Sequence, residues 1–304
     1  YASSREGLVL LQLAVETITG KSVEELAKEK VFIPFGMNNT SYQWQPRFED
    51  NYALGYDVSG NALQKRKTRP VNAAGSMETT IGDYSRFIYN VLHGKGLDEK
   101  MRQEMFSPQI PVLNRRQFPS LNNDTTSENK KIQLSYGLGW GLLKSPHGWA
   151  FFKEGHDDGW EHYNINFIDK KTSLIIMTNS SNGESIFKEM LEEIIGDVYT
   201  PWQWESYVPY FAYLNTPVAE LNNYTGTYKM GEMEAVVSSE DGKLYLEAAK
   251  GGVTKQKLYL MPGGRFRLRE FPVEIDFQKD NNGNVIKMIA WVDKTDRNEF
   301  TRVK

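Results

Sequence analysis

Apolar side chains recur at helical spacing near the start of the chain. The residues at this spacing are Leu8, Leu11, Val15 and Ile18. Positions three or four apart lie on one face of a helix, so the pattern predicts a helix over residues 4–19. Further apolar residues at 9, 10, 13 and 14 widen the face. We therefore expect this helix to be buried on more than one side.

Polar residues mark where further helices begin and end. Ser22 and Glu25 have the spacing of a capping box, in which each side chain satisfies a free N–H group of the first turn. The helix that they start is expected to end before Pro34. Two later stretches, near 81–93 and 184–196, also show apolar residues at helical spacing.

From residue 136 the pattern changes to one typical of strands. Apolar stretches at 149–152, 162–168 and 173–178 are short and bounded by turn residues. The polar residues 169–172 lie between the last two stretches, which indicates a hairpin. The first part of the chain is therefore expected to be an antiparallel sheet with flanking helices.

The last part of the chain shows only strand patterns. From residue 219 onward, short apolar stretches alternate with turns rich in Gly, Asp and Asn. About eight strands in roughly 85 residues are typical of a small antiparallel barrel or sandwich. We predict an α+β fold with three regions: a first domain over 1–199, a linker over 200–218 and an all-β domain over 219–304.

The expected linker is rich in aromatic residues. They are Trp202, Trp204, Tyr207, Tyr210, Phe211 and Tyr213. Large aromatic side chains mostly contribute packing area, so inter-domain packing is favoured over a platform for a ligand.

Composition excludes several classes of function. The chain has 304 residues, which suggests two domains, and its net charge of −3 argues against a nucleic-acid partner. The absence of cysteine excludes disulfides, thiolate metal sites and a cysteine nucleophile. The sequence contains no apolar run of about 18 residues, so no transmembrane segment is expected, and it contains no signal peptide.

Four short motifs occur in a fixed order over the first part of the chain. They are Tyr1-Ala2-Ser3 with Gly20-Lys21-Ser22 after the helix, then residues 33–40 (IPFGMNNT), then residues 73–84 (AAGSMETTIGDY), and lastly Tyr136-Gly137-Leu138-Gly139-Trp140 with Gly155-His156-Asp157-Asp158-Gly159. Each motif is weak alone, but their order and spacing make a specific signal.

Together these motifs resemble the penicillin-recognising serine hydrolases, specifically the class C β-lactamases, D-alanyl-D-alanine carboxypeptidases and related esterases. The resemblance implies a partial β-lactamase/transpeptidase-like fold and hydrolysis of an amide or ester through an acyl-enzyme. Residues 221–228 (LNNYTGTY) are similar to the lipocalin-like β domain often appended to such enzymes.

The resemblance also implies roles for individual residues. Tyr1 would take the place of the proton-relay tyrosine, and Ser3 would hydrogen-bond to the relay or to the substrate. His156 would stand where the family has a Lys or His that contributes positive charge or a donor. Gly159 and Trp160 belong to the strand expected to supply a backbone N–H to the oxyanion hole.

In this family the nucleophile is the serine of Ser-x-x-Lys, upstream of the tyrosine motif. The tetrapeptide Ser127-Glu128-Asn129-Lys130 has this spelling, but it follows the tyrosine motif and lies in a polar stretch without a helical pattern. A solvated loop serine is therefore favoured there over a nucleophile. We expect the chain to be the C-terminal portion of a hydrolase, inactive alone, with the missing N-terminal portion of the domain as its partner.

The sequence departs from the family at Asp157 and Asp158, where small residues are usual. Asp158 would then lie against the substrate and disfavour an anionic one. Two alternatives to the catalytic role of His156 stay open: a turn histidine paired to Asp157 or Asp158, and a metal ligand together with Asp158 and His162. The second is disfavoured because a third firm ligand is lacking, and we expect neither a metal nor a cofactor.

Two functions remain in competition. The first is the serine hydrolase, acting on a small-molecule or peptide substrate in the periplasm or otherwise outside the bacterial cytoplasm, with any signal peptide upstream. The second is a non-catalytic binding module that kept the scaffold and lost the site.

Overall fold

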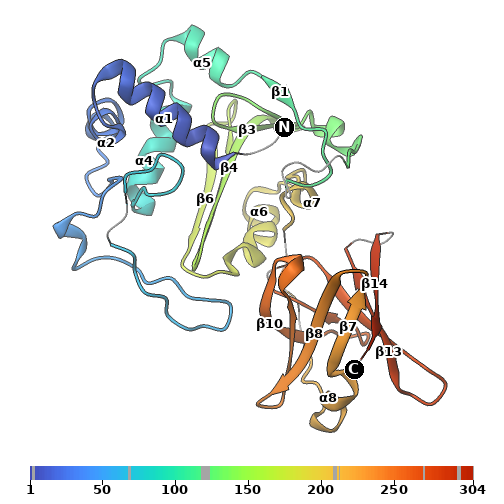
Figure 1. Ribbon diagram of the computed structural model, residues 1–304. Coiled ribbons are helices and arrows are strands. Elements are labelled where there is room, and N and C mark those ends of the chain that lie inside the picture. Colours follow the sequence, from blue (N-terminus) through green and yellow to red (C-terminus); the bar gives the residue numbers. More distant parts are fainter. Residues whose placement is uncertain are drawn as a thin grey trace. The chain divides into compact units, whose positions relative to one another are not determined.

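The computed structural model describes residues 1, 4–67, 70–117, 124–207, 211, 213–269, 271–292 and 296–303. The chain forms two units, Tyr1–Tyr207 and Val208–Lys304 (Figure 1). Ser3, one of the expected site residues, lies outside the described residues.

The first helices begin where the capping signals predicted. In α1 (Arg5–Thr19) the Ser4 hydroxyl accepts a hydrogen bond from the Gly7 N–H, and Gly20 ends the helix in the left-handed conformation, with φ 66°. The capping box of Ser22 and Glu25 is present at the start of α2 (Val23–Ala27).

The expected end of this second helical stretch before Pro34 was wrong, because the helix continues to Phe35. A π-helical turn, η1 (Lys28–Phe32), leads into α3 (Ile33–Phe35), which contains Pro34 in its first turn. Proline is tolerated there because the first turn of a helix leaves its N–H groups without intrahelical partners. Gly36, in the left-handed conformation, supplies the stop instead.

The expectation that α1 is buried on more than one side was also wrong for this chain. None of its residues is buried, and the side chains of Leu10 and Ile18 are 66% and 84% exposed. The apolar residues are those of a core helix, but no described segment covers most of their surface.

A six-stranded antiparallel sheet forms the centre of the first unit, in the order β1-β2-β3-β4-β5-β6. The strands are β1 (Ile110–Pro111), β2 (Ser135–Tyr136), β3 (Gly141–Ser145), β4 (Gly148–Asp157), β5 (Trp160–Phe167) and β6 (Thr172–Thr178). The last three are the strands that the sequence predicted, and each extends beyond its expected range.

Helices cover both faces of this sheet, as Figure 1 shows. On one side lie α6 (Phe187–Ile195), the preceding 3-10 turn η4 (Gly183–Ile186) and α7 (Trp202–Glu205), packed on Phe152 and Tyr163. On the other side α4 (Ile81–Leu92) packs on Phe151. The remaining short helices of this unit are η2 (Pro46–Phe48), α5 (Glu99–Met105) and η3 (Glu128–Ile132).

The start of the aromatic-rich segment belongs to the core of the first unit. Trp204 is 1% exposed, and it packs with Tyr207 on the same sheet face as α6. These two residues therefore pack within the first unit, and this contact is not the expected inter-domain packing.

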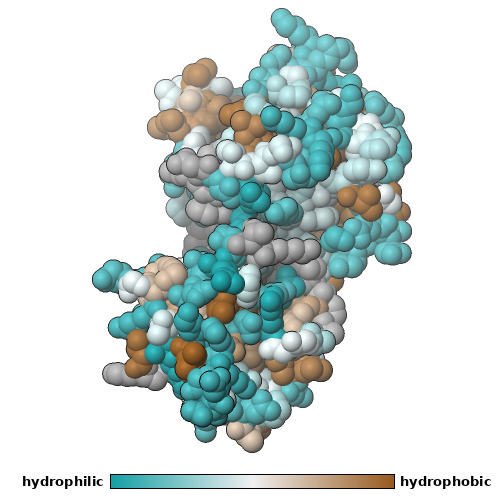
Figure 2. Space-filling view, turned by 90° about the vertical axis from the view of Figure 1, so that its right-hand side faces the viewer, coloured by the Kyte–Doolittle hydropathy of each residue, from teal (hydrophilic) through white to brown (hydrophobic). Residues whose placement is uncertain are grey.

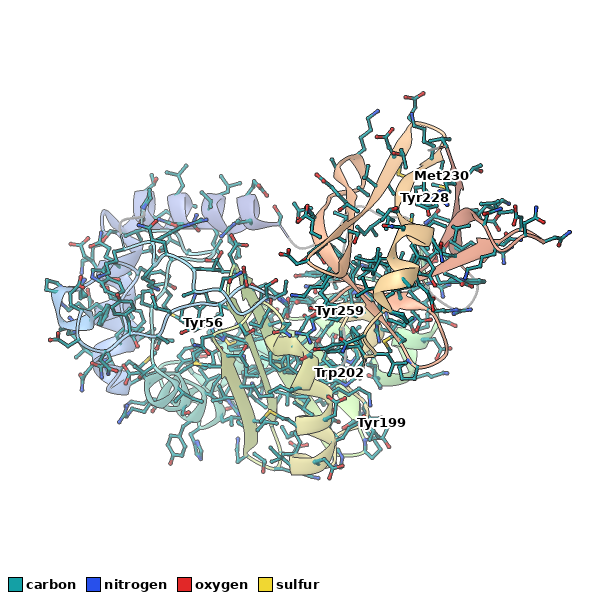
Figure 3. The ribbon with its side chains drawn as sticks, turned by 90° about the horizontal axis from the view of Figure 1, so that it is seen from below. Tyr56, Tyr199, Trp202, Tyr228, Met230 and Tyr259 are labelled. Carbon is teal, nitrogen blue, oxygen red and sulfur yellow. The ribbon has the colours of Figure 1, made fainter. Side chains whose placement is uncertain are left out.

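The second unit contains a closed antiparallel barrel of eight strands, in the order β10-β11-β12-β13-β14-β7-β8-β9. Its elements are α8 (Val218–Tyr224), β7 (Gly226–Met230), β8 (Met233–Glu240), β9 (Lys243–Ala248), η5 (Ala249–Gly251), β10 (Val253–Leu260), β11 (Phe266–Arg267), β12 (Glu274–Lys279), β13 (Val285–Trp291) and β14 (Arg297–Arg302). Tyr228, labelled in Figure 3, is fully buried in its core. The α+β class, with an antiparallel sheet and a small barrel, is confirmed.

On the surface shown in Figure 2 hydrophilic residues predominate, and hydrophobic residues lie singly or in small groups over most of the view. None of the described helices has the length and apolar character that a membrane span needs.

Candidate functional site

The candidate site lies at the end of the β4–β5 hairpin. In this hairpin His156 pairs directly with Glu161, and Asp157 pairs with Trp160. Residues that face each other across an antiparallel pair point to the same side of the sheet. The hairpin register therefore places the His156 imidazole beside the Glu161 carboxylate.

The two side chains form an ion pair. His156 Nδ1 contacts Glu161 Oε2 directly, and Glu184 Oε2, from η4, lies 4.0 Å from the same nitrogen. The His156 side chain is 44% exposed. Burial would lower the pKa of His156, but the hydrogen bond to Glu161 and the negative charges of Glu161, Glu184 and Glu154 outweigh it and raise the pKa.

A small cavity of about 10 Å³ opens beside this pair, large enough for about one water molecule. Its lining comes from the sheet, from the start of α6 and from α7, whose Trp202 is labelled in Figure 3. The lining residues are Glu154, His156, Tyr163, Glu184, Phe187, Trp202, Glu205 and Tyr207.

Two further glutamates of the lining have different protonation preferences. Burial raises the pKa of Glu205 well above its usual range; Glu154 adds to the shift, whereas the hydrogen bond that Tyr163 donates to Glu205, at 3.1 Å, opposes it. Burial pushes the pKa of Glu154 up as well, but Lys153 and the Gln117 amide, 2.7 Å away, together lower it. The site therefore combines a neutral buried carboxyl group with an ionised one.

Tyr1 lies on the sheet face that carries His156. Its ring is half-buried and stacks on Tyr136, with the ring centres 3.7 Å apart, and lies 6.3 Å from Trp204. Tyr136 and Trp204 pack in turn on Phe152, which precedes His156 on β4 by four residues and shares its face. The ring thus packs on protein, on the sheet face that carries His156.

The hairpin turn that contains Asp158 and Gly159 packs against a distant loop. Gly159 has φ +81°, and a Cβ added there would lie 2.8 Å from Gly55 Cα. The Gly159 N–H donates to Ser181 Oγ at 2.8 Å, so this N–H already has an acceptor. Asp158 lies 3.6 Å from Arg66, with both side chains exposed.

Trp160 is the remaining expected substrate-binding residue. Its ring lies under the Lys65 ammonium group, 5.4 Å from the ring centre, and Lys65 in turn pairs with Glu78. Trp160 therefore lies where the 42–67 segment contacts the hairpin.

The metal alternative of His156, Asp158 and His162 is not supported by their positions. His162 pairs with Gly155, one place along from the His156–Glu161 pair, and so points to the opposite face of the sheet. Within the described residues, a ring nitrogen of His156 and carboxylate oxygens of Glu161 and Glu184 do lie within 4.8 Å of one another. In this structure His156 Nδ1 and Glu161 Oε2 are in direct contact. The same contact shows that the histidine pairs with Glu161 rather than with Asp157 or Asp158.

Ser127 and Lys130 are both exposed; Ser127 precedes the short helix η3, and Lys130 lies within it. A second tetrapeptide of the same spelling, Ser185 to Lys188, runs from η4 into the start of α6. There Lys188 Nζ is held by Glu192 at 2.5 Å, and Tyr207 donates to the Ser185 carbonyl oxygen. Its lysine is therefore engaged on the helix surface.

The glutamates around His156 also escaped the sequence prediction. Glu154 precedes His156 by two residues, so strand alternation alone places both on one face, and this signal was available. Glu161, Glu184 and Glu205 carry no comparable local signal, because their approach depends on the hairpin register and on how η4 and α7 fold back.

Comparison with known proteins gives evidence about the relatives of this chain that does not depend on the geometry of the site. Penicillin-binding protein 4* of Bacillus subtilis (strain 168) is 27% identical over 297 residues, a match that covers 90% of this chain and 60% of that protein. The chain thus spans about 60% of the length of this relative.

Solved structures support the same fold. The octameric penicillin-binding protein homologue from Pyrococcus abyssi is similar over 98% of this chain and 64% of its own, with a TM-score of 0.50 and 18% identity. A β-lactamase/D-alanine carboxypeptidase from Pseudomonas syringae is similar over 65% of this chain and 59% of its own, with a TM-score of 0.51 and 12% identity.

One family matches most of the first unit. The family described as Beta-lactamase matches residues 1–195, a range that includes both Tyr1 and the β4–β5 hairpin with His156. That range is more than half of the 304 residues. The chain therefore belongs to the β-lactamase family of serine hydrolases.

Proposed function

We propose that this chain is the C-terminal portion of a serine hydrolase that cleaves an amide or ester through an acyl-enzyme, as peptidases and esterases do. The observation that carries the proposal is His156: it stands at the open end of β4, in the motif of the matched family, and carboxylates hold it in the cationic form. A cationic donor at that place can stabilise charge that develops on a substrate carbonyl oxygen.

The proposed chemistry has two steps. A serine oxygen attacks the carbonyl carbon, its proton passes through the Tyr1 phenol to the leaving amine or alcohol, and the acyl–serine ester forms. Water then attacks this ester and releases the acid. His156 donates a hydrogen bond to the substrate, and a backbone N–H of the hairpin beyond Gly159 faces the carbonyl oxygen. Trp160 lies on the opposite face of the sheet from His156, so it stays outside this arrangement.

We infer that the serine belongs to polypeptide outside these 304 residues and that the chain alone is inactive. The exposed positions of Ser127 and Lys130, and the engaged Lys188, support this. So does the apolar surface of α1, which suits a covering segment of the same domain. The missing N-terminal portion is thus the proposed partner.

The turn of the hairpin narrows the substrate class. Asp157 and Asp158 add negative charge next to the acidic cavity, which favours a neutral or cationic substrate over an anionic one. The relationship to a penicillin-binding protein supports export to the cell envelope, in the periplasm or outside the cell. The barrel of the second unit is proposed to be lipocalin-like.

Covalent labelling tests the proposal. A fluorescent penicillin and a fluorescent fluorophosphonate are each incubated with the 304-residue chain and with the product of the complete reading frame. We expect labelling of the longer polypeptide only. Labelling of the 304-residue chain at a serine contradicts the inferred location of the nucleophile, and failure of both probes on both polypeptides counts against the hydrolase.

A non-catalytic binding module is the second candidate. It is favoured by the Gly159 N–H, which is already bonded to Ser181, and by Asp158, which replaces the small residue expected beside a substrate. Reversible binding of a labelled peptide or amide without covalent adduct, in the longer polypeptide, is the outcome that this candidate predicts.

A further inference from the structure

We propose that Glu161 is a positioning residue whose carboxylate binds Nδ1 of the His156 imidazole. This contact keeps the ring cationic and leaves its Nε2–H as the free donor. The ion pair itself is a property of the chain. Its use in catalysis rests on the proposed function above.

The geometry of the hairpin supports this role. Glu161 is the cross-strand partner of His156, and its carboxylate reaches the ring directly. Glu161 is 8% exposed, and among the described residues no hydrogen-bond donor reaches its Oε2 apart from that ring contact. A buried carboxylate oxygen without another donor depends on that one contact, which makes the contact specific.

The groups on the neighbouring elements all favour the same arrangement. Glu184 approaches Nδ1 from η4, and Glu154 lies two residues earlier on β4. Glu205, on α7, is the neutral carboxyl group of the same cavity, and Tyr163 and Tyr207 line it as phenols.

On β5 the adjacent His162 points to the other face of the sheet, and its own pKa is lowered, first by burial and further by the His156 charge. Glu161 itself has a raised pKa because of burial, partly offset by His156. Burial and the contact between the two groups therefore act in opposite directions on the pKa of each.

The consequence is a defined donor. A histidine with Nδ1 bound to a carboxylate has its Nε2–H as the remaining donor, and its ring orientation is fixed. Since the His156 side chain is 44% exposed, the ring is partly accessible from solvent at the hairpin end, where a substrate would approach.

Imidazole NMR of the 304-residue chain tests the proposal without requiring activity. The chain has only four histidines, so ¹⁵N-labelled ring signals can be assigned by single His→Gln variants and followed through a pH titration. We expect the titration midpoint of His156 to fall in Glu161→Gln and to recover in part in Glu161→Asp. The matched control Glu128→Gln, which removes an exposed glutamate paired to Lys131, leaves it unchanged.

Two outcomes overturn the proposal. One is a His156 midpoint that stays in place in Glu161→Gln while the His147 and His162 signals show an intact fold. The other is a His156 signal that changes when EDTA is added, which places a metal rather than a proton at Nδ1. If Glu161→Gln does not fold, Glu161→Asp is compared with the wild type and must show a shifted midpoint.

The role in catalysis has a separate readout. In a polypeptide that reacts with the labelling probes, Glu161→Gln should shift the pH profile of the labelling rate in the same direction as the His156 midpoint. A uniform loss of rate at all pH values indicates a merely structural role. A normal NMR result with no labelling in any polypeptide leaves the ion pair in place and rejects the proposed function instead.

Discussion

Glu205 shows how burial can dominate the protonation state of a single side chain. It accepts a hydrogen bond from Tyr163 in the core of the first unit, and burial raises its pKa well above the usual range. In the unfolded chain its pKa is about 4.3. Between these two pKa values the folded state keeps a proton that the unfolded state has lost, so stability falls as the pH rises.

Replacement of Glu205 by glutamine tests this account. Glutamine is close in shape and does not titrate, so Glu205→Gln should become progressively more stable than the wild type as the pH increases above about 4.3. The difference grows by up to about 1.4 kcal/mol per pH unit for one proton. Urea unfolding between pH 4 and 8 measures it. Glu193→Gln, an exposed position on α6, serves as control, and equal pH dependence of all three proteins would contradict a buried neutral Glu205.

At the residue scale, sequence reasoning identified His156 through its motif but not what holds it. The motif names the histidine and the turn, whereas Glu161 becomes its partner only once the register of β4 and β5 is fixed. A one-residue slip in that register would turn Glu161 to the other face. The expected partners, Asp157 and Asp158, are nearer in sequence, but the turn carries them past the ring, and Asp158 approaches Arg66 instead.

At the scale of elements, the β4–β5 hairpin is fixed by its contact with the loop near Gly55. Gly159 adopts φ +81°, and a Cβ there would come within 2.8 Å of Gly55 Cα and 2.9 Å of the Tyr56 backbone nitrogen. Tyr56, labelled in Figure 3, also accepts a hydrogen bond from the Ser181 N–H through its carbonyl group. The hairpin end, the loop and the segment after β6 therefore form one packed corner.

Gly159→Ala should lower the stability of the protein by more than alanine at a positive φ usually does, because the added Cβ would meet atoms of this corner. We expect a destabilisation of about 2–4 kcal/mol, the sum of backbone strain and overpacking. Gly139→Ala is the matched control, because Gly139 has φ +86° and no atom within 4 Å of an added Cβ, so it should cost only about 1 kcal/mol. Chemical denaturation gives both values. Equal losses in the two variants would mean that the loop does not constrain the hairpin.

The sequence predicted elements well where local chemistry decides them. Ser22 with Glu25, and Gly20, mark helix boundaries through groups only a few residues apart, and the structure confirms both. Apolar stretches predicted β4, β5 and β6 of the first unit and the strand-rich character of the second. The helix through Pro34 was missed because a π-helical turn, which has no simple sequence signal, changes the phase of the helix before the proline.

At the scale of the whole molecule, the two units differ in how completely they bury their apolar residues. The barrel closes on itself, and its core includes fully buried side chains such as Tyr228 and Phe266. In the first unit, α1 has the composition of a core helix but an exposed surface, and β6 is the last strand of the sheet, with no described strand paired along its outer edge. Amphipathic pattern predicts that a surface will be buried; it does not say which polypeptide buries it.

The apolar surface of α1 therefore predicts the behaviour of the isolated chain. Leu10, Leu13 and Ile18 are 66%, 59% and 84% exposed on one short helix, and contiguous apolar surface of this kind drives association. We expect the isolated chain to self-associate as its concentration increases. The triple variant Leu10→Gln, Leu13→Gln, Ile18→Gln should reduce this association and leave the melting of the chain nearly unchanged, because none of the three side chains is buried.

Sedimentation velocity over a range of concentrations measures the effect. Val218→Gln is the control: Val218 is 74% exposed on α8 of the second unit, and a singly exposed apolar residue of this kind contributes little to association. A wild-type chain that remains a stable species of 34.9 kDa at all concentrations would contradict the argument. α1 follows directly on the motif of Tyr1. A chain that stays monomeric with α1 exposed to solvent would therefore also weaken the inference that a further segment of the domain, which carries the serine, packs against this helix.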